Sequence, residues 1–97
     1  MKIPVNQFGI PQFPHDDARR LFVLAYAIEL LERPTPCALE DLTGVPRDAV
    51  DAAVHILCEQ YGMIIRRFGD IYRIASWGSL LNKEGVQQIV HSYPHQN

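Results

Sequence analysis

The sequence predicts a mostly helical α+β fold in which three helices precede a β-hairpin, and three observations predict it. Two short helical patterns, over residues 36–43 and 47–61, are joined by a turn of three residues. A stretch rich in β-branched and aromatic residues follows over residues 63–74 and is interrupted by Gly69-Asp70. A longer apolar helical pattern precedes them over residues 16–32. The chain has 97 residues, of which 47% are hydrophobic, so we expect one small domain with tails.

The first helix is expected over residues 16–32. Asp16 or Asp17 can cap it, and both place negative charge at its start, while Pro34 stops it. Its segment over residues 21–28 is apolar around nearly the whole circumference, which is more than one side of a three-helix core requires. We therefore expect a further element to cover it, which could be an N-terminal arm, a C-terminal helix or a second subunit.

The connection between the second and third helices has the composition of a tight turn. Thr35 can cap the helix over residues 36–43, and Pro36 then occupies its first position, where a missing N–H is harmless. Gly44 suits the left-handed conformation just past a helix end, and Pro46 fixes φ beside the cap of the next helix. The sequence thus predicts a helix, a sharp turn and a second helix.

The helix expected over residues 47–61 is amphipathic. Its apolar stripe consists of Val50, Ala53, Val54, Leu57 and Tyr61. The polar residues lie mainly on the other side and are Arg47, Asp48, Asp51, His55 and Glu59. Gly62 can close the helix in a left-handed conformation.

The hairpin register follows from its turn. Gly69-Asp70 can form the two central residues of a type II′ turn, which sets Phe68 opposite Ile71. Alternation then predicts an inner face that packs on the helices, made of Met63, Ile65, Tyr72 and Ile74.

The same register predicts an unusual pair of arginines. Arg66 lies directly opposite Arg73 on the outer face, where like charges are mildly destabilising. An anion such as phosphate is therefore expected to bind there and reduce the repulsion. Arg67 lies opposite Tyr72 on the inner face, with its stem on the tyrosine, and a one-residue change of turn would exchange its role with that of Arg66.

The helices, the Gly44 turn and the hairpin resemble the winged helix-turn-helix domains of bacterial transcription regulators, over about residues 17–74. The residues that carry the resemblance are Leu39, Leu42, Thr43-Gly44-Val45, Val50, Leu57, Gly62-Met63-Ile64 and Tyr72-Arg73-Ile74. The resemblance implies a three-helix core with a β-hairpin wing over residues 16–78, and a transcriptional regulator that binds duplex DNA. Some winged helices bind proteins instead, so a protein-interaction module is the alternative.

Two flanking segments complete the expected organisation. Residues 1–15, with three prolines, should form an extended arm that packs on its own domain or exchanges with a partner subunit. Residues 79–97 should contain a last helix, capped by Asn82, with Leu81 and Val86 forming a hydrophobic staple. The apolar stripe of this helix consists of Val86, Ile89, Val90 and Tyr93, and Pro94 ends it. This stripe and the apolar first helix together favour a homodimer, although the last helix could equally pack on the first.

The candidate DNA-binding residues lie on the third helix and on the hairpin. If the helix enters the major groove, Arg47 and His55 are hydrogen-bond donors, and Asp48 and Asp51 can accept from cytosine while repelling phosphate. The alternative is that this helix face is simply exposed to solvent, and that Asp51 pairs with His55 one turn further along the helix. On the hairpin, the residues expected to contact phosphates are Arg66, Arg73 and, depending on the turn, Arg67.

Charge distribution favours the hairpin over the helix. The whole chain has a formal net charge of −2, which gives no global attraction to nucleic acid. Residues 34–61 hold one arginine against five carboxylates, whereas residues 62–97 hold four cations against two carboxylates. The hairpin is therefore basic and the presumed reading helix acidic.

Several other classes of function find no support. The sequence contains no nucleophile motif, glycine-rich phosphate loop or pair of catalytic carboxylates, so neither an enzyme, a small-molecule substrate nor a cofactor is expected. Cys37, Cys58 and His55 are too scattered for a zinc framework, and we expect both thiols to be buried in a reducing compartment. The longest apolar run is too short to span a membrane and no signal peptide is evident, so a cytoplasmic protein is expected.

Overall fold

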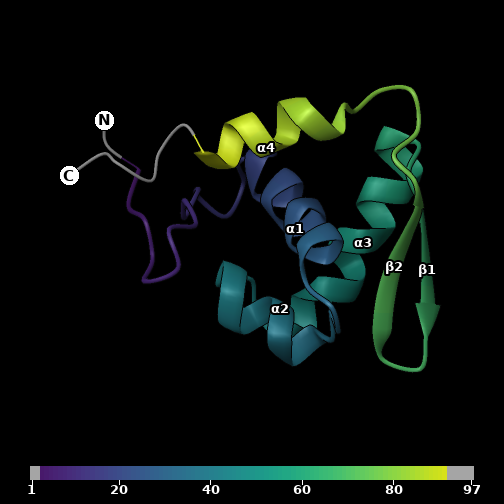
Figure 1. The fold of residues 1–97 in the computed structure, drawn as a ribbon, viewed down its shortest axis with the longest axis horizontal. Coiled ribbons are helices and arrows are strands. Elements are labelled where there is room, and N and C mark those ends of the chain that lie inside the picture. The colour runs from purple at the N-terminus through teal and green to yellow at the C-terminus, as the bar shows by residue number, and fades with distance from the viewer. Residues whose placement is uncertain (1–2, 92–97) are drawn as a thin grey trace.

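The computed structural model describes residues 3–91 and places three helices before a β-hairpin and a fourth helix after it (Figure 1). The elements are α1 (Arg19–Leu30), α2 (Pro36–Thr43), α3 (Arg47–Tyr61), β1 (Ile64–Phe68), β2 (Ile71–Ser76) and α4 (Lys83–His91). The order and class are those predicted from the sequence. No helix in this part of the chain combines the length and apolar character needed to cross a membrane.

The turn between α2 and α3 forms as predicted. The Thr35 hydroxyl accepts a hydrogen bond from the Ala38 N–H at 3.1 Å, and Gly44 adopts φ 81° just past the end of α2. A Cβ atom at Gly44 would collide with the Gln12 side chain, which donates to the Thr43 carbonyl. Val45 then turns its side chain into the core. Glycine is thus favoured here by its left-handed conformation, whereas the end of the Gln12 side chain could move to admit a Cβ atom.

The hairpin has the predicted register, with Phe68 opposite Ile71 and Arg66 opposite Arg73. Gly69 has φ 66° and Asp70 does not have a positive φ, which are the signs of a type II′ turn. An irregularity between Ile64 and its neighbour Ile65 bends the base of the hairpin.

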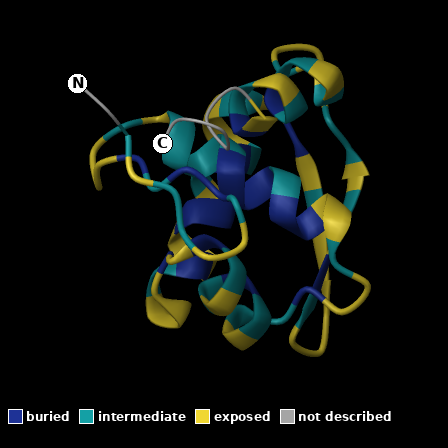
Figure 2. Ribbon diagram, turned by 60° about the vertical axis from the view of Figure 1, so that its left-hand side comes forward, coloured by how far each residue is buried: buried dark blue, intermediate teal, exposed yellow. Residues whose placement is uncertain are grey.

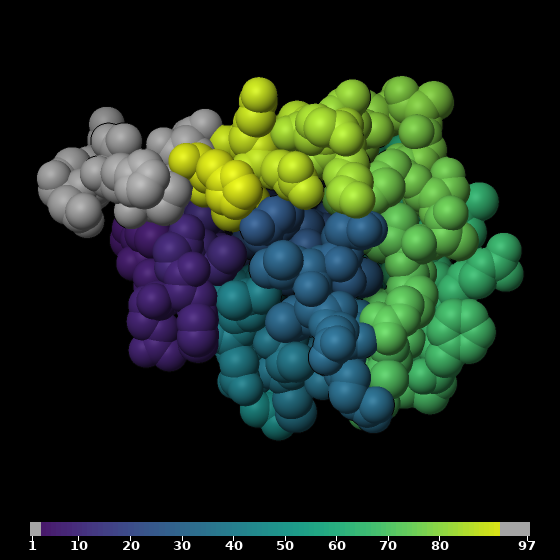
Figure 3. Space-filling model, in the orientation of Figure 1, coloured from purple at the N-terminus to yellow at the C-terminus, as the bar shows by residue number. Residues whose placement is uncertain are grey.

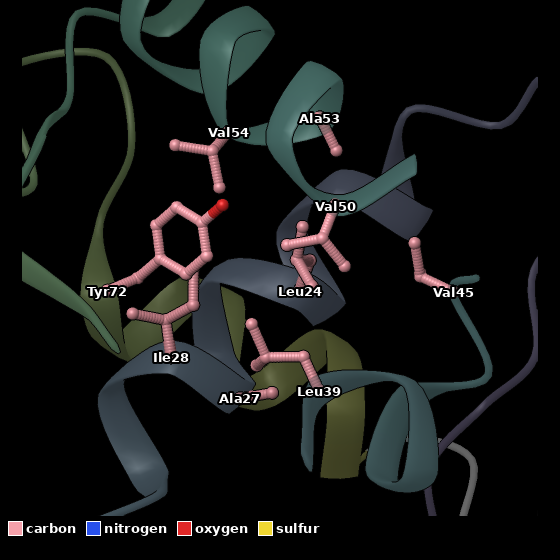
Figure 4. Packing of buried hydrophobic residues seen from close by; sticks show 9 residues of the cluster. All are labelled: Leu24, Ala27, Ile28, Leu39, Val45, Val50, Ala53, Val54 and Tyr72. Atoms are coloured by element: carbon pink, nitrogen blue, oxygen red, sulfur yellow. The ribbon is translucent and has the colours of Figure 1, made fainter. Parts of the chain in front are cut away.

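The core confirms which face of the hairpin is the inner one. Tyr72 is 2% exposed and lies against α1 and α3, and Met63 is also buried, while Ile65 and Ile74 are half-buried (Figure 4). The main cluster draws on α1, α2, the turn, α3 and β2, and contains Leu24, Ala27, Ile28, Leu39, Val45, Val50, Ala53, Val54 and Tyr72. The hairpin is therefore anchored to the helices by one face only.

Helix α1 is shorter than the predicted range of residues 16–32. At its start the Asp17 carboxylate accepts from the Arg19 N–H at 2.9 Å, so the chain turns before it becomes helical. At its end Leu31 is extended, because the linker after it follows β2. The Tyr72 N–H donates to the Pro34 carbonyl at 3.1 Å, which holds the linker against β2.

The apolar circumference of α1 is covered from within the chain. Ile10 and Phe13 of the arm and Val90 of α4 pack with Val23 of α1. Figure 2 shows that the buried residues gather in the middle of the molecule, and Figure 3 shows α4 lying against α1. Of the three predicted coverings, the arm and the C-terminal helix are thus the ones present, and α1 gives no further argument for a second subunit.

The flanking segments bear out most of the remaining expectations. The arm folds back on itself, with Val5 paired to Pro11 in an isolated bridge, instead of extending away. The Asn82 side chain accepts from the Gly85 N–H at 2.9 Å, which confirms it as the cap of α4. Tyr93 and Pro94 lie outside the described residues.

One expectation about the cysteines is wrong. Cys58 is half-buried, but Cys37 is exposed, whereas both thiols were expected inside. The reason is that α2 turns Leu39 and Thr43 inward, so that Cys37, in the first turn, falls on the solvent side.

Candidate nucleic-acid interface

The predicted binding residues lie on two neighbouring surfaces. We call the exposed residues Asp48, Asp51, His55 and Glu59 the α3 face. We call the residues that alternation turns away from the helices, Arg66, Phe68, Ile71 and Arg73, the outer face of the hairpin. Both surfaces border solvent, and the hairpin stands at one side of the molecule next to α3 (Figure 1).

Arg47, at the start of α3, is already paired. Its Nε lies 2.7 Å from Glu40 Oε1, and a second guanidinium nitrogen lies 3.1 Å from the Cys37 sulfur. The hydrogen bond with Glu40 raises the pKa of Arg47 above its usual value. An exposed pair of this kind is weak, but it offsets the positive charge that the sequence offered to DNA.

Asp51 faces the hairpin and joins it to α3. Its Oδ1 accepts from the Tyr72 hydroxyl at 2.9 Å and lies 3.5 Å from an Arg67 guanidinium nitrogen. The guanidinium of Arg67 also lies over the Tyr72 ring, 5.4 Å from its centroid, as predicted for an inward arginine. Burial, and then the hydrogen bond to Asp51, raise the pKa of Tyr72. Arg67 and Asp51 therefore neutralise each other.

The alternative interpretation of the α3 face expected His55 to pair with Asp51, but the two residues do not pair. The His55 Nε2 lies 3.4 Å from Glu59 Oε2, one turn further along, because Asp51 is turned to Tyr72. Asp48 is exposed, and among residues 3–91 it takes part in no ion pair. The α3 face thus presents carboxylates, and the two arginines near it, Arg47 and Arg67, are each paired with a carboxylate.

The outer face of the hairpin differs in charge. Arg66 and Arg73 are exposed and directly opposite each other, as predicted. Arg73 donates to the Glu32 carbonyl at 2.6 Å, which holds the side chain without cancelling its charge. Within the described part of the chain, neither arginine has a carboxylate within ion-pair distance. The uncompensated positive charge of this region lies here.

Two exposed residues, one on this surface and one on the neighbouring linker, were not singled out from the sequence. Phe68, at the hairpin tip, is 61% exposed. Arg33 is exposed on the linker beside β2. The signal for Phe68 was present, because the period of two that turns Arg66 outward also turns Phe68 outward. No pattern in the sequence indicates the position of Arg33, because the contact between the linker and β2 is a tertiary one.

A cleft of about 420 Å³ lies elsewhere, between the start of α1 and the side of α3 away from the hairpin. Its walls are mostly apolar, and none of the predicted binding residues lines it. Among residues 3–91 no three His, Cys, Asp or Glu side chains gather as metal ligands. The predicted residues therefore form an exposed surface that lies outside this cleft.

Comparison with models of protein families, with curated proteins and with solved structures finds no match to this chain.

Proposed function

We propose that this chain is a small winged-helix protein that binds duplex DNA and acts as a transcriptional regulator. The helix, turn, helix and hairpin supply the arrangement of that class, in which the hairpin is the wing. The observation that carries the proposal is the pair Arg66 and Arg73, two uncompensated cations directly opposite each other beside a helix-turn-helix. Phosphates would remove the repulsion between them.

The two elements of this proposed interface differ in the charge that they present to DNA. An α3 helix in the major groove would bring Asp48 near phosphates, while Arg47 is held by Glu40. On the wing, by contrast, the exposed guanidinium groups of Arg66 and Arg73 can contact the phosphates of the DNA directly. We therefore expect the wing to supply most of the affinity and α3 to supply little.

The test is fluorescence anisotropy with mixed-sequence duplex DNA over a salt series. The Arg66→Ala/Arg73→Ala variant should bind more weakly and lose about two units of log–log salt slope, because each phosphate contact contributes about 0.9. Arg20→Ala is the matched control, since Arg20 at the start of α1 also has no ion-pair carboxylate among the described residues. Its slope should stay within about half a unit of the wild-type value.

A second candidate function is a protein-interaction module, which the carboxylates of the α3 face favour. In that case wild-type protein would fail to bind duplex DNA even at low salt. It would instead bind a lysine-rich peptide, and the Asp48→Asn/Glu59→Gln variant would bind that peptide more weakly. Retained DNA binding with an unchanged peptide affinity would exclude this candidate.

A further inference from the structure

We infer that Phe68 is an apolar wedge that enters the DNA minor groove and bends the duplex. This inference rests on the proposed function. Phe68 is 61% exposed, whereas Phe13 is buried and Phe22 packs edge-on against Tyr61. An exposed apolar residue is common by itself, so the neighbours of Phe68 decide what its exposure means.

Phe68 belongs to a compact amphipathic patch. Its cross-strand partner is Ile71, and the next outward pair toward the base of the hairpin is Arg66 with Arg73. Opposite residues lie about 5 Å apart and alternate residues along a strand about 7 Å apart. Two apolar side chains at the tip are thus followed within one step by two uncompensated cations.

The minor groove of duplex DNA fits this combination. The groove is about 6 Å wide, with phosphates along its rims, so it matches a narrow tip backed by arginines. Proteins that bind there commonly insert a Phe, Leu or Ile side chain between base steps and bend the duplex by about 20–90°.

Single-stranded nucleic acid fits less well. Surfaces that bind single strands stack successive bases on several aromatic side chains. Within residues 3–91 the outer face of the hairpin carries one aromatic residue, Phe68. A single ring is sufficient for one wedge and insufficient for a stacking platform, so we commit to the duplex.

A wedge also predicts a sequence preference without hydrogen bonds to bases. Pyrimidine–purine steps such as TA unstack and kink more easily than other steps. Wild-type protein should therefore bind a duplex with a central TA step more tightly than one whose centre is a stiff A-tract, by about fivefold.

The experiment compares two doubly labelled duplexes, one with a central TA step and one with an A-tract, by energy transfer and by anisotropy. Wild-type protein should shorten the end-to-end distance of the TA duplex. Phe68→Ala should abolish that shortening and remove the preference for the TA step, while its salt slope stays within about half a unit of wild type because both arginines are kept. Phe8→Ala is the matched control, since Phe8 is 53% exposed on the arm, and it should behave as wild type.

The outcomes separate this inference from the proposed function. Salt-dependent binding by wild type without bending, or bending that Phe68→Ala retains, overturns the wedge alone. Tighter binding to a single strand that depends on Phe68 overturns it in favour of base stacking. No binding to any duplex overturns both proposals. Circular dichroism of Phe68→Ala should match wild type, because the residue lies outside the core.

Discussion

The α3 face and the outer face of the hairpin lie side by side, yet their arginines are in opposite states. Arg47 beside the α3 face is paired with Glu40, and the inward Arg67 is paired with Asp51. Arg66 and Arg73 on the outer face are exposed, and no carboxylate of residues 3–91 lies within ion-pair distance of them. The charge that a surface presents therefore depends on which carboxylates reach its arginines, and a count of cations in the sequence does not show this.

The cause of the difference is the alternation of the hairpin. Inward residues meet α3 and its carboxylates, whereas outward residues meet the linker backbone, which offers the carbonyl of Glu32 to Arg73. A carbonyl accepts a hydrogen bond and leaves the guanidinium charge in place. The two faces of one hairpin therefore divide into an anchoring face and a charged face.

The largest effect should come from removing the anchor. Tyr72→Ala deletes a side chain that is 2% exposed and should lower the free energy of unfolding by about 3–5 kcal/mol, as truncation of a buried aromatic residue does. Phe68→Ala, on the other face of the same hairpin, should change it by less than about 0.5 kcal/mol. Urea denaturation followed by circular dichroism measures both. Similar losses in the two variants would mean that the faces are not distinct.

A smaller effect should come from reversing a charge on the α3 face. Asp48→Lys removes a repulsion and should raise the affinity for duplex DNA by about fivefold at low salt, corresponding to about 1 kcal/mol. Glu84→Lys is the matched control, because Glu84 is likewise an exposed acid in the first turn of a helix, α4. Anisotropy at two salt concentrations compares them. An equal gain in both variants would place α3 away from the DNA.

The fold was predictable where the local sequence favours a single backbone conformation or strand register. Gly44 and Gly69 mark positions with positive φ, and once the hairpin turn is placed, the period of two determines which arginines face outward. The C-terminal end of α1 was less predictable, because the linker leaves the helix to bond β2 through Pro34. Local sequence carries no information about that distant partner.

The candidate site was predictable in position and less so in charge. The sequence placed Arg66 and Arg73 opposite each other, since register alone decides that. It could not show that Glu40 would reach Arg47 across the turn, or that Asp51 would face Tyr72 instead of His55. Such pairings depend on side-chain directions and on the angle between elements, which no spacing rule contains.

A last predicted effect concerns the hydrogen bond that joins the hairpin to α3. Burial and the bond to Asp51 raise the pKa of Tyr72, so the folded state holds the phenolic proton more tightly than the unfolded chain does. Stability from this source is complete below the unfolded pKa of about 10 and is lost as the pH rises through the higher folded value. Tyr72→Phe should lower the free energy of unfolding by about 0.5–1.5 kcal/mol at pH 7.

The Tyr72→Phe variant should also lose less folding stability at alkaline pH than the wild-type protein does. Urea denaturation between pH 9 and pH 11, about one unit on either side of the unfolded tyrosine pKa, should show wild-type stability falling more steeply than that of Tyr72→Phe. The other titrating groups are common to both proteins and cancel in the difference. Parallel pH profiles would show that the Tyr72 proton is held no more tightly in the folded state, and Asp51 would then not be the contact that ties the hairpin to α3.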